Sequence, residues 1–444
     1  MTLPLLLTAL LAGTPSPPTE RARVIIETDA GGDPDDEQSL VRFLLYANEW
    51  DVEGIIANRP TARPGENLNP VRTGLGIVRR LLDAYGQVVD NLRRHDPRYP
   101  ARDELWARTV SGYADSRAAV DLLRAAVDRD DPRPIWFQNW GTDAGSDPSS
   151  LERALDEVLA ERGPEGYARF KSRLRLCSDQ RFGRHTFDLA PAFPLWIDAG
   201  RPEVFGQRWY RQFGPLTAKA GGFDLRRDAL TDHGPLGALY PTNTGIAQKE
   251  GDSAYFIYLI PTGMNDPEHP EWGAWSGRYA PRDDRQPPIP GYWWATASDT
   301  WQGTTRRDNV LARWAADLQN DFRARLDWCV QPPEQANHRP LAVLNGDSTG
   351  RILHQTAAPG DQIKLSAAGS HDPDGDALSY TWWCYGEAGS YRGPVRIDRA
   401  DTPEAVLHVP ADAAGQTLHL LLTLRDNGDP PLAGYRRLIV TVGG

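Results

Sequence analysis

Four aspartates stand close together near the start of the chain. They are Asp29, Asp33, Asp35 and Asp36, and two glycines lie among them. Carboxylates crowded in this way repel one another unless a cation holds them, and their oxygens are ligands that Ca²⁺ and Mg²⁺ prefer. Capping of a helix N-terminus explains one or two of these acids, because the helix dipole stabilises negative charge there, but it does not explain four. The loop therefore predicts a site for a divalent cation.

The elements around this acidic loop place it where ligands usually bind. Residues 23–28 predict a buried strand, residues 36–48 carry apolar side chains at helical spacing, and residues 51–57 predict a second strand. A strand, a helix and a strand in this order predict a right-handed parallel crossover. In an open parallel sheet, ligands sit at the carboxyl ends of the strands, and the acidic loop begins there.

The alternation of strands and helices continues to residue 328. Helices are expected over 75–85, 118–127, 151–159 and 309–328, and strands over 134–139, 174–178, 194–198 and 254–260. This rhythm predicts an α/β fold, with a doubly wound, mostly parallel sheet of the Rossmann-like kind.

The pattern changes after a polar, proline-bearing linker at residues 331–340. Short alternating runs follow at 341–344, 362–366, 379–383, 405–409, 417–424 and 437–442. Turn clusters separate them, and this spacing predicts a small all-β sandwich of immunoglobulin type over residues 341–444. The α/β domain is accordingly expected over residues 23–330.

The first 22 residues are expected to form a leader. A short apolar stretch followed by small and turn-forming residues is typical of a signal peptide, although the usual basic residues before it are missing. We therefore expect a secreted or periplasmic protein, with a disordered leader as the alternative. Further along, no apolar run approaches the roughly 18 residues of a membrane span. The 49 Lys and Arg against 60 Asp and Glu, without a basic run, argue against nucleic-acid binding.

The acidic loop resembles the opening signature of the nucleoside hydrolases. Thr28-Asp29, Gly31 and Asp35-Asp36 match it, while Glu27 replaces its first aspartate and two extra residues precede the pair. The closer resemblance is to a bacterial family of cellulose-binding proteins with an N-terminal nucleoside-hydrolase-like domain and a C-terminal immunoglobulin-like domain. The runs that carry it are 32–40, 249–253, 259–267, 370–376 and 387–391.

This resemblance implies a Ca²⁺ site and a catalytic base. The ion would be held by Asp29, Asp36 and Asp252, together with the backbone carbonyl of Thr142. Asp29 would also take the proton of a water that attacks the anomeric carbon of a sugar, because a carboxylate within hydrogen-bond reach can act as general base.

The resemblance also implies contacts to the substrate. Asp35 would accept a hydrogen bond from a sugar hydroxyl and Asn58 would contact the ring, with Asp33 as the alternative to Asp35. Departures from the family pattern include Gly251, which stands where some nucleoside hydrolases carry a histidine beside the distal aspartate. These departures favour a furanoside or another glycoside over a nucleoside as the substrate.

Five further residues have both a functional and a plain interpretation. His233 could protonate the leaving oxygen, or it could be an ordinary hydrogen-bonded loop histidine. Asn265, Asp266, Trp272 and Trp275 could form a sugar-binding rim in which the indoles serve as stacking platforms, with core packing of the tryptophans as the alternative.

Two functions are therefore expected. The first is a secreted Ca²⁺-dependent hydrolase of O- or N-glycosyl bonds. The second is a non-catalytic protein that binds cellulose or another insoluble polysaccharide and retains the nucleoside-hydrolase fold. The expected partner is a carbohydrate or glycoside, and self-association into a homo-oligomer stays open.

Overall fold

The computed structural model describes residues 20–113, 117–141, 148–179, 181–199, 224–243, 248–282 and 288–444. Its main sheet is built from β1 (Ala22–Thr28), β2 (Trp50–Ala57), β3 (Thr109–Ser111), β4 (Ile135–Asn139), β5 (Leu174–Cys177), β6 (Leu195–Asp198), β7 (Ala280–Pro281) and β8 (Tyr292–Trp294). The strand order is β3-β2-β1-β4-β5-β6-β8-β7, and only the β7–β8 pair of this sheet is antiparallel. The order reverses between β1 and β4, which is the topological switch point of a doubly wound sheet. The predicted α/β fold is confirmed.

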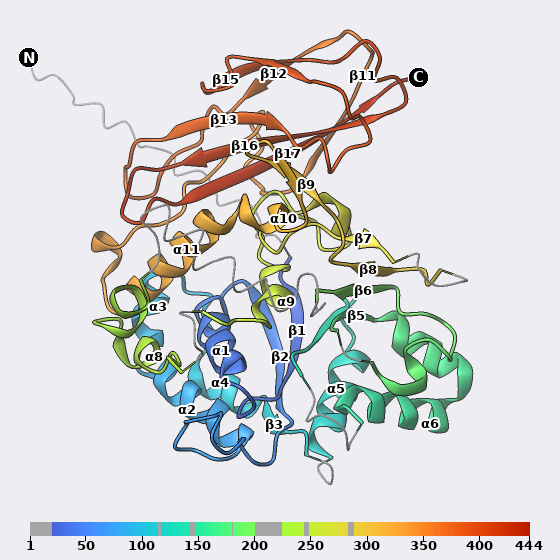
Figure 1. Ribbon diagram of the computed structural model, residues 1–444, viewed down its shortest axis with the longest axis vertical. Helices are drawn as coiled ribbons and strands as arrows, with labels where there is room; N and C mark the ends of the chain where they lie inside the picture. The colour runs from blue at the N-terminus through green and yellow to red at the C-terminus, as the bar shows by residue number, and fades with distance from the viewer. Residues whose placement is uncertain are drawn as a thin grey trace, which may run out of the picture.

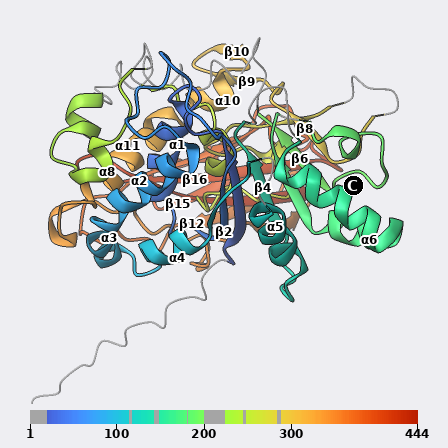
Figure 2. The same cartoon turned by 90° about the horizontal axis from the view of Figure 1, so that it is seen from below.

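Helices cover both faces of the sheet (Figures 1 and 2). They are α1 (Asp35–Leu45), α2 (Gly74–Gly86), α3 (Val89–His95), α4 (Arg102–Ala107), α5 (Ala118–Asp128), α6 (Ser150–Ser172), α8 (Gly234–Ala238), α9 (Ser253–Ile257), α10 (Asn309–Ala312) and α11 (Ala315–Asp327), with short turns η1 (Gly183–His185), η2 (Arg226–Leu230), η3 (Pro270–Trp272) and η4 (Pro333–Gln335). Because side chains alternate along a strand, Val24 and Ile26 of β1 pack in the core formed with α1 and α2, whereas Ile25 packs with α5 and α6. None of the described helices has the length and apolarity that a membrane crossing requires.

The prediction of a strand over 254–260 is wrong. Residues 253–257 form helix α9, and the chain turns through 258–260. The whole run is buried, so apolar side chains face every direction and leave no amphipathic stripe. A short run of this kind has no periodicity that separates a buried strand from a buried helix.

Three other elements differ from expectation. The helix expected over 309–328 is interrupted at 313–314, where Trp314 packs against aromatic side chains of the C-terminal domain. The helix expected over 151–159 extends to residue 172, beyond a kink at Gly163. Residues 341–344 form no strand, because only isolated bridges at Leu341 and Leu344 pair them with other segments.

The C-terminal domain consists of two facing sheets. Its strands are β11 (Leu353–Ala357), β12 (Gln362–Ser366), β13 (Ser379–Cys384), β14 (Arg396–Asp398), β15 (Glu404–His408), β16 (Thr417–Arg425) and β17 (Ala433–Val442). One sheet has the order β11-β17-β16-β13 and the other β12-β15-β14, with their own apolar core between them. The predicted all-β domain is confirmed. A separate hairpin of β9 (Asp299–Trp301) and β10 (Thr304–Arg306) belongs to the preceding part of the chain.

The two domains share part of one hydrophobic core. The sandwich sits on α10 and α11 (Figure 1), and Tyr435 of β17 belongs to the same buried cluster as β1 and α1. The Tyr435 hydroxyl donates to Asp317 Oδ2 at 2.5 Å, and its ring lies 5.9 Å from the ring of Trp314. A buried aromatic and polar contact of this kind makes the sandwich an integral part of the molecule.

We expect Gly263→Ala to weaken this contact. Gly263 has a φ of +85°, and a Cβ added there would lie 2.2 Å from the carbonyl oxygen of Tyr435. Gly346 is the matched control, because its φ is +82° but an added Cβ would meet nothing within 4 Å. Gly346→Ala should cost about 1 kcal/mol of unfolding free energy from backbone strain, and Gly263→Ala about 2–4 kcal/mol because overpacking is added. Denaturant unfolding measures both, and equal losses would contradict the close contact.

Candidate metal and substrate site

Three loops meet at the switch point of the main sheet. Asp29 follows β1, Asn58 follows β2 and Gly141 follows β4. The Asn58 amide Nδ2 donates to the Gly141 carbonyl oxygen at 2.6 Å, which joins the ends of strands that flank β1 on either side. The acidic loop therefore lies in the position where ligands of doubly wound sheets bind.

The start of α1 is fixed by its contacts to β1. The Thr28 hydroxyl donates to Asp36 Oδ1, and the Asp29 backbone N–H donates to the same oxygen at 3.1 Å. Asp36 is 1% exposed. These bonds hold one side of its carboxylate and orient it from the first turn of α1 into the loop.

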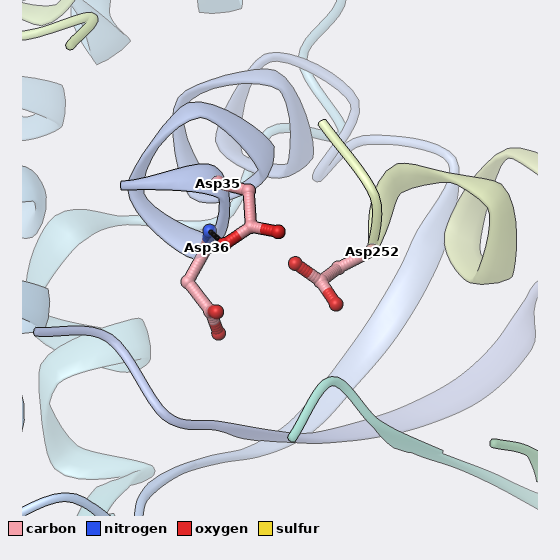
Figure 3. Close-up of side chains that lie close together, drawn as sticks. All are labelled: Asp35, Asp36 and Asp252. Carbon is pink, nitrogen blue, oxygen red and sulfur yellow. Dashed lines mark hydrogen bonds between the residues drawn. The ribbon is translucent and has the colours of Figure 1, made fainter. Parts of the chain in front are cut away.

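Asp35, Asp36 and Asp252 lie close together, and the carboxylates of Asp35 and Asp252 point toward each other (Figure 3). Asp35 and Asp36 open α1, while Asp252 stands directly before α9. One carboxylate oxygen from each lies within 4.8 Å of the others, a span that matches two opposite Ca²⁺–O bonds of about 2.4 Å. Asp252 Oδ2 is buried and makes no hydrogen bond within the described part of the chain. An oxygen-only donor set with an unsatisfied buried oxygen fits a hard divalent cation.

The electrostatics of this cluster favour a bound cation. Burial, together with the charges of Asp252 and Asp29, raises the pKa of Asp36 well above its usual range. Burial and the charges of Asp29 and Asp179 raise the pKa of Asp252 in the same way. Each carboxylate therefore disfavours the charged form of its neighbours, and a cation would relieve this repulsion. Asp179, an exposed residue that follows β5, is not one of the three clustered acids, but its charge acts on Asp252, and the sequence analysis did not identify it.

Asp29 is bound by an arginine that the sequence analysis also missed. Arg59 Nη2 donates to Asp29 Oδ2 at 2.8 Å, and Arg59 Nε donates to the Asp29 carbonyl oxygen at 3.1 Å. Gly141 permits this packing, because a Cβ there would lie 3.0 Å from Asp29 Cγ. Arg59 directly follows Asn58, so its position after β2 was the available signal.

Asp33 forms an ion pair of its own with Lys249. Lys249 Nζ contacts Asp33 Oδ2, and the Lys249 backbone N–H donates to Gln38 Oε1 at 2.6 Å. Burial lowers the pKa of Lys249. Asp33 and Lys249 are both about one-quarter exposed, so solvent reaches this ion pair.

The structure does not bring His233 to the acidic loop. It precedes α8, and its Nε2 lies 3.0 Å from Asp327 Oδ1 at the end of α11. Asp327 belongs to the end of the domain that faces away from the start of α1, because Arg325, one half-turn earlier, bonds the carbonyl oxygen of Leu45 at the end of α1. Thr142 lies outside the described residues.

The expected sugar-binding rim has a different arrangement. Asn265 Oδ1 accepts from the Thr262 backbone N–H at 3.1 Å, and Asp266 Oδ1 accepts from the Glu268 N–H at 2.9 Å, so both stabilise turns. Trp275 is 1% exposed, and its Nε1 donates to the Tyr435 hydroxyl oxygen at 3.4 Å.

Trp272 also belongs to the contact between the domains. Its ring stacks on His269 with centroids 3.9 Å apart and meets the His419 ring of β16 edge-on at 5.5 Å. Arg437 Nη2 donates to the Trp272 carbonyl oxygen at 3.0 Å. The packing alternative describes both tryptophans better than an exposed rim.

The fold and the acidic loop together define a nucleoside-hydrolase-like domain followed by an all-β domain. Residues 23–279 match the family described as cellulose-binding Sde182, nucleoside hydrolase-like domain, and residues 362–442 match the cellulose-binding protein Sde0182 C-terminal domain. The chain belongs to this family, as the sequence resemblance predicted.

A solved structure agrees over almost the entire chain. A nucleoside hydrolase-related hypothetical protein from Saccharophagus degradans, associated with carbohydrate metabolism, is 31% identical and superposes with a TM-score of 0.74. The match covers 95% of this chain and 100% of that one. The PKD domain from KIAA 1837 protein is 20% identical over 24% of this chain and 93% of its own, with a TM-score of 0.17. No curated protein matches the chain.

We expect Asp36→Asn to stabilise the metal-free protein at neutral pH. The native pKa of Asp36 is raised, so the folded state holds this proton more tightly than the unfolded state, where the pKa is about 3.9. The contribution of Asp36 to stability is therefore present below about pH 4 and is lost as pH rises. Asparagine cannot ionise, yet its Oδ1 still accepts from Thr28.

The measurement is denaturant unfolding in EDTA between pH 4 and 8. The gain in unfolding free energy of Asp36→Asn over the wild type should grow with pH to more than about 1 kcal/mol at pH 7. Asp401→Asn, at an exposed aspartate of the sandwich, is the control and should show no such trend. A gain that is constant or falls with pH would contradict the raised pKa.

Proposed function

We propose that this chain is a divalent-cation-dependent hydrolase of glycosyl bonds, with Ca²⁺ as its ion and a furanoside or another neutral glycoside as its substrate. The observation that supports it best is the cluster of Asp35, Asp36 and Asp252, in which the buried Oδ2 of Asp252 has no hydrogen-bond partner among the residues that the structure describes. A purely structural role would leave three mutually repelling carboxylates without a stabilising charge.

The residues of the site would have different roles. Asp36 and Asp252 would hold the ion, with Asp35 or Asp29 completing its ligands. When bound, the ion would supply a Lewis acid and lower the pKa of water beside it. Asp29 would accept a proton from a water that attacks the anomeric carbon, the glycosyl bond would break, and the leaving group would take its proton from solvent. Arg59 positions the Asp29 carboxylate through the bond at 2.8 Å. Asn58, held against Gly141, offers a polar contact to the sugar ring.

The substrate would contact Asp33 and Lys249. Their ion pair is partly exposed and has polar atoms that can bond to sugar hydroxyls, which supports a role for Asp33 in substrate binding. The signal-like leader supports export, so the substrate would be met in the periplasm or outside the cell. A glycan or a glycoside released from one is the class of compound that an exported hydrolase of this kind would use.

A second function, binding of cellulose or another polysaccharide without turnover, is favoured by two observations. The family is described as cellulose-binding. In addition, His233 is paired with Asp327, so it does not supply the acid that the hydrolytic scheme assigned to it. The two functions differ in whether the acidic loop is needed.

We expect Asp36→Ala and Asp252→Asn to abolish Ca²⁺ binding and hydrolysis. Removing a ligand leaves the remaining carboxylates unable to hold the ion, so kcat/KM should fall at least about 10³-fold. Calorimetric titration of the full chain with Ca²⁺ and a panel of aryl furanosides, aryl pyranosides and nucleosides measure both effects. Asp401→Asn is the control and should behave as the wild type. Tight Ca²⁺ binding with no turnover on any substrate would favour the binding function, and absence of Ca²⁺ binding by the wild type would contradict the metal site.

His233→Gln gives an independent test of the site. His233 bonds Asp327 and stands outside the acidic loop, so its loss should change kcat/KM by less than about twofold while it lowers the melting temperature slightly. A loss of turnover comparable to that of Asp36→Ala, with metal binding retained, would show that His233 takes part in the reaction.

A further inference from the structure

A second cleft lies between the domains, away from the acidic loop. It has a volume of about 430 Å³ and is bordered by α11 and the β9–β10 hairpin on one side and by β13 and β16 on the other. This volume is within the range of ligand-binding sites, which often occur between domains. None of the residues that border it belongs to the acidic site. We propose that this cleft binds a segment of a neutral polysaccharide chain.

Aromatic side chains supply the apolar surface of the cleft. Trp301 ends β9 and Trp383 lies on β13, and both indoles are partly exposed. Trp314 borders the cleft from α11's N-terminal end, with its ring 5.9 Å from that of Trp383. Indole faces suit the flat C–H faces of pyranose rings, because they offer a large rigid surface with few rotatable bonds.

Trp314 also offers a hydrogen-bond donor that needs a partner. Its side chain is 3% exposed, and the Nε1 atom is buried without a hydrogen bond in the part of the chain that the structure describes. A buried polar group without a partner costs free energy. Because Trp314 borders the cleft, a ligand there can supply a hydroxyl to this donor once the indole turns toward it.

The charges that border the cleft are already balanced. Arg425 Nη2 lies 2.6 Å and 2.7 Å from the two carboxylate oxygens of Asp317. Arg313 Nε lies 3.5 Å from Asp299 Oδ2, and Arg313 Nη2 lies 4.0 Å from Glu387 Oε1. A cleft in which every cation has a carboxylate does not favour an anionic ligand such as a phosphate. It favours a neutral ligand with many hydroxyl groups, which can share these donors and acceptors.

The hairpin tip carries a residue that its turn does not require. Gln302 and Gly303 both have positive φ, at 50° and 76°, which is the geometry of a type I′ hairpin turn. Asparagine, aspartate or glycine is the usual residue at the first position, so glutamine bears a conformational cost there. Gln302 is exposed and borders the cleft, where its amide can bond to a sugar hydroxyl.

The experiment measures saccharide binding by the full chain. Cellohexaose is titrated by calorimetry, and retention is measured on microcrystalline cellulose, xylan and chitin, with and without EDTA. Binding in this cleft does not depend on hydrolysis. Cellohexaose is the first probe because the family is described as cellulose-binding. Trp301→Ala is the main variant because Trp301 stands on an exposed hairpin, and Trp383→Ala is the second variant. Trp106→Ala is the control, since Trp106 is a partly exposed tryptophan on α4 that stacks with Arg102.

We expect Trp301→Ala and Trp383→Ala to weaken saccharide binding at least about tenfold, while Trp106→Ala has no effect. Binding should persist in EDTA and in Asp36→Ala, which separates this cleft from the acidic site. Melting temperatures identify any loss that comes from unfolding, and Gln302→Ala gives a milder change at the same site. Wild-type affinity in Trp301→Ala and Gln302→Ala, binding that requires Asp36, or no binding of the wild type to any of these saccharides would each overturn the proposal.

Discussion

The acidic site depends on one buried ion pair. Arg42 of α1 and Glu250, 208 residues apart in the chain, are both fully buried, and Arg42 Nη2 lies 3.0 Å from Glu250 Oε1. Glu250 Oε2 also accepts from the Ser253 hydroxyl at 2.9 Å, at the start of α9. The pair thus fixes the distance between the helix that carries Asp36 and the turn that carries Asp252. Removing one member would leave a buried charge alone, at a cost of about 3–5 kcal/mol.

The same helix links the acidic site to the sandwich through α11. Arg42 Nη2 donates to Gln319 Oε1 at 3.3 Å, and the Tyr46 hydroxyl donates to Asp321 Oδ1 at 2.6 Å. One turn before Asp321, α11 presents Asp317 to Arg425 and Tyr435 of the sandwich. α11 is therefore packed between both domains by buried polar contacts. The related structure from Saccharophagus degradans matches 95% of this chain, so the match extends across both domains.

The parts of the fold with a clear period could be predicted from the sequence, and the parts set by tertiary packing could not. The β1–α1–β2 unit combines an apolar strand with an amphipathic helix, so its type and the place of the acidic loop at the carboxyl end of β1 followed directly. The run 254–260 has no polar face because it is enclosed on all sides, and its helix was missed for that reason. Asp36 and Asp252 are brought together by a pair of residues far apart in the chain, and only the family resemblance linked them. Arg59 and Asp179 each follow a strand as a single charge, which has no signal until its partner is known. Lys249 lies in the run 249–253 that carries the family resemblance, but the resemblance implied no role for it.

The acidic site contains more negative charge than its two basic side chains balance. Asp29 is matched by Arg59 and Asp33 by Lys249, which leaves Asp35, Asp36 and Asp252 for a divalent ion. If all three are ionised, these ligands and the ion together keep an excess of about one negative charge, and the nearby Asp179 adds to it. Hydrolysis of a glycosyl bond passes through a transition state in which positive charge develops on the sugar ring, and a fixed negative environment in a buried site stabilises that charge. The same excess would repel a phosphorylated sugar. The crowding of carboxylates that destabilises the metal-free protein is thus the property that would select a neutral glycoside and favour breaking its bond.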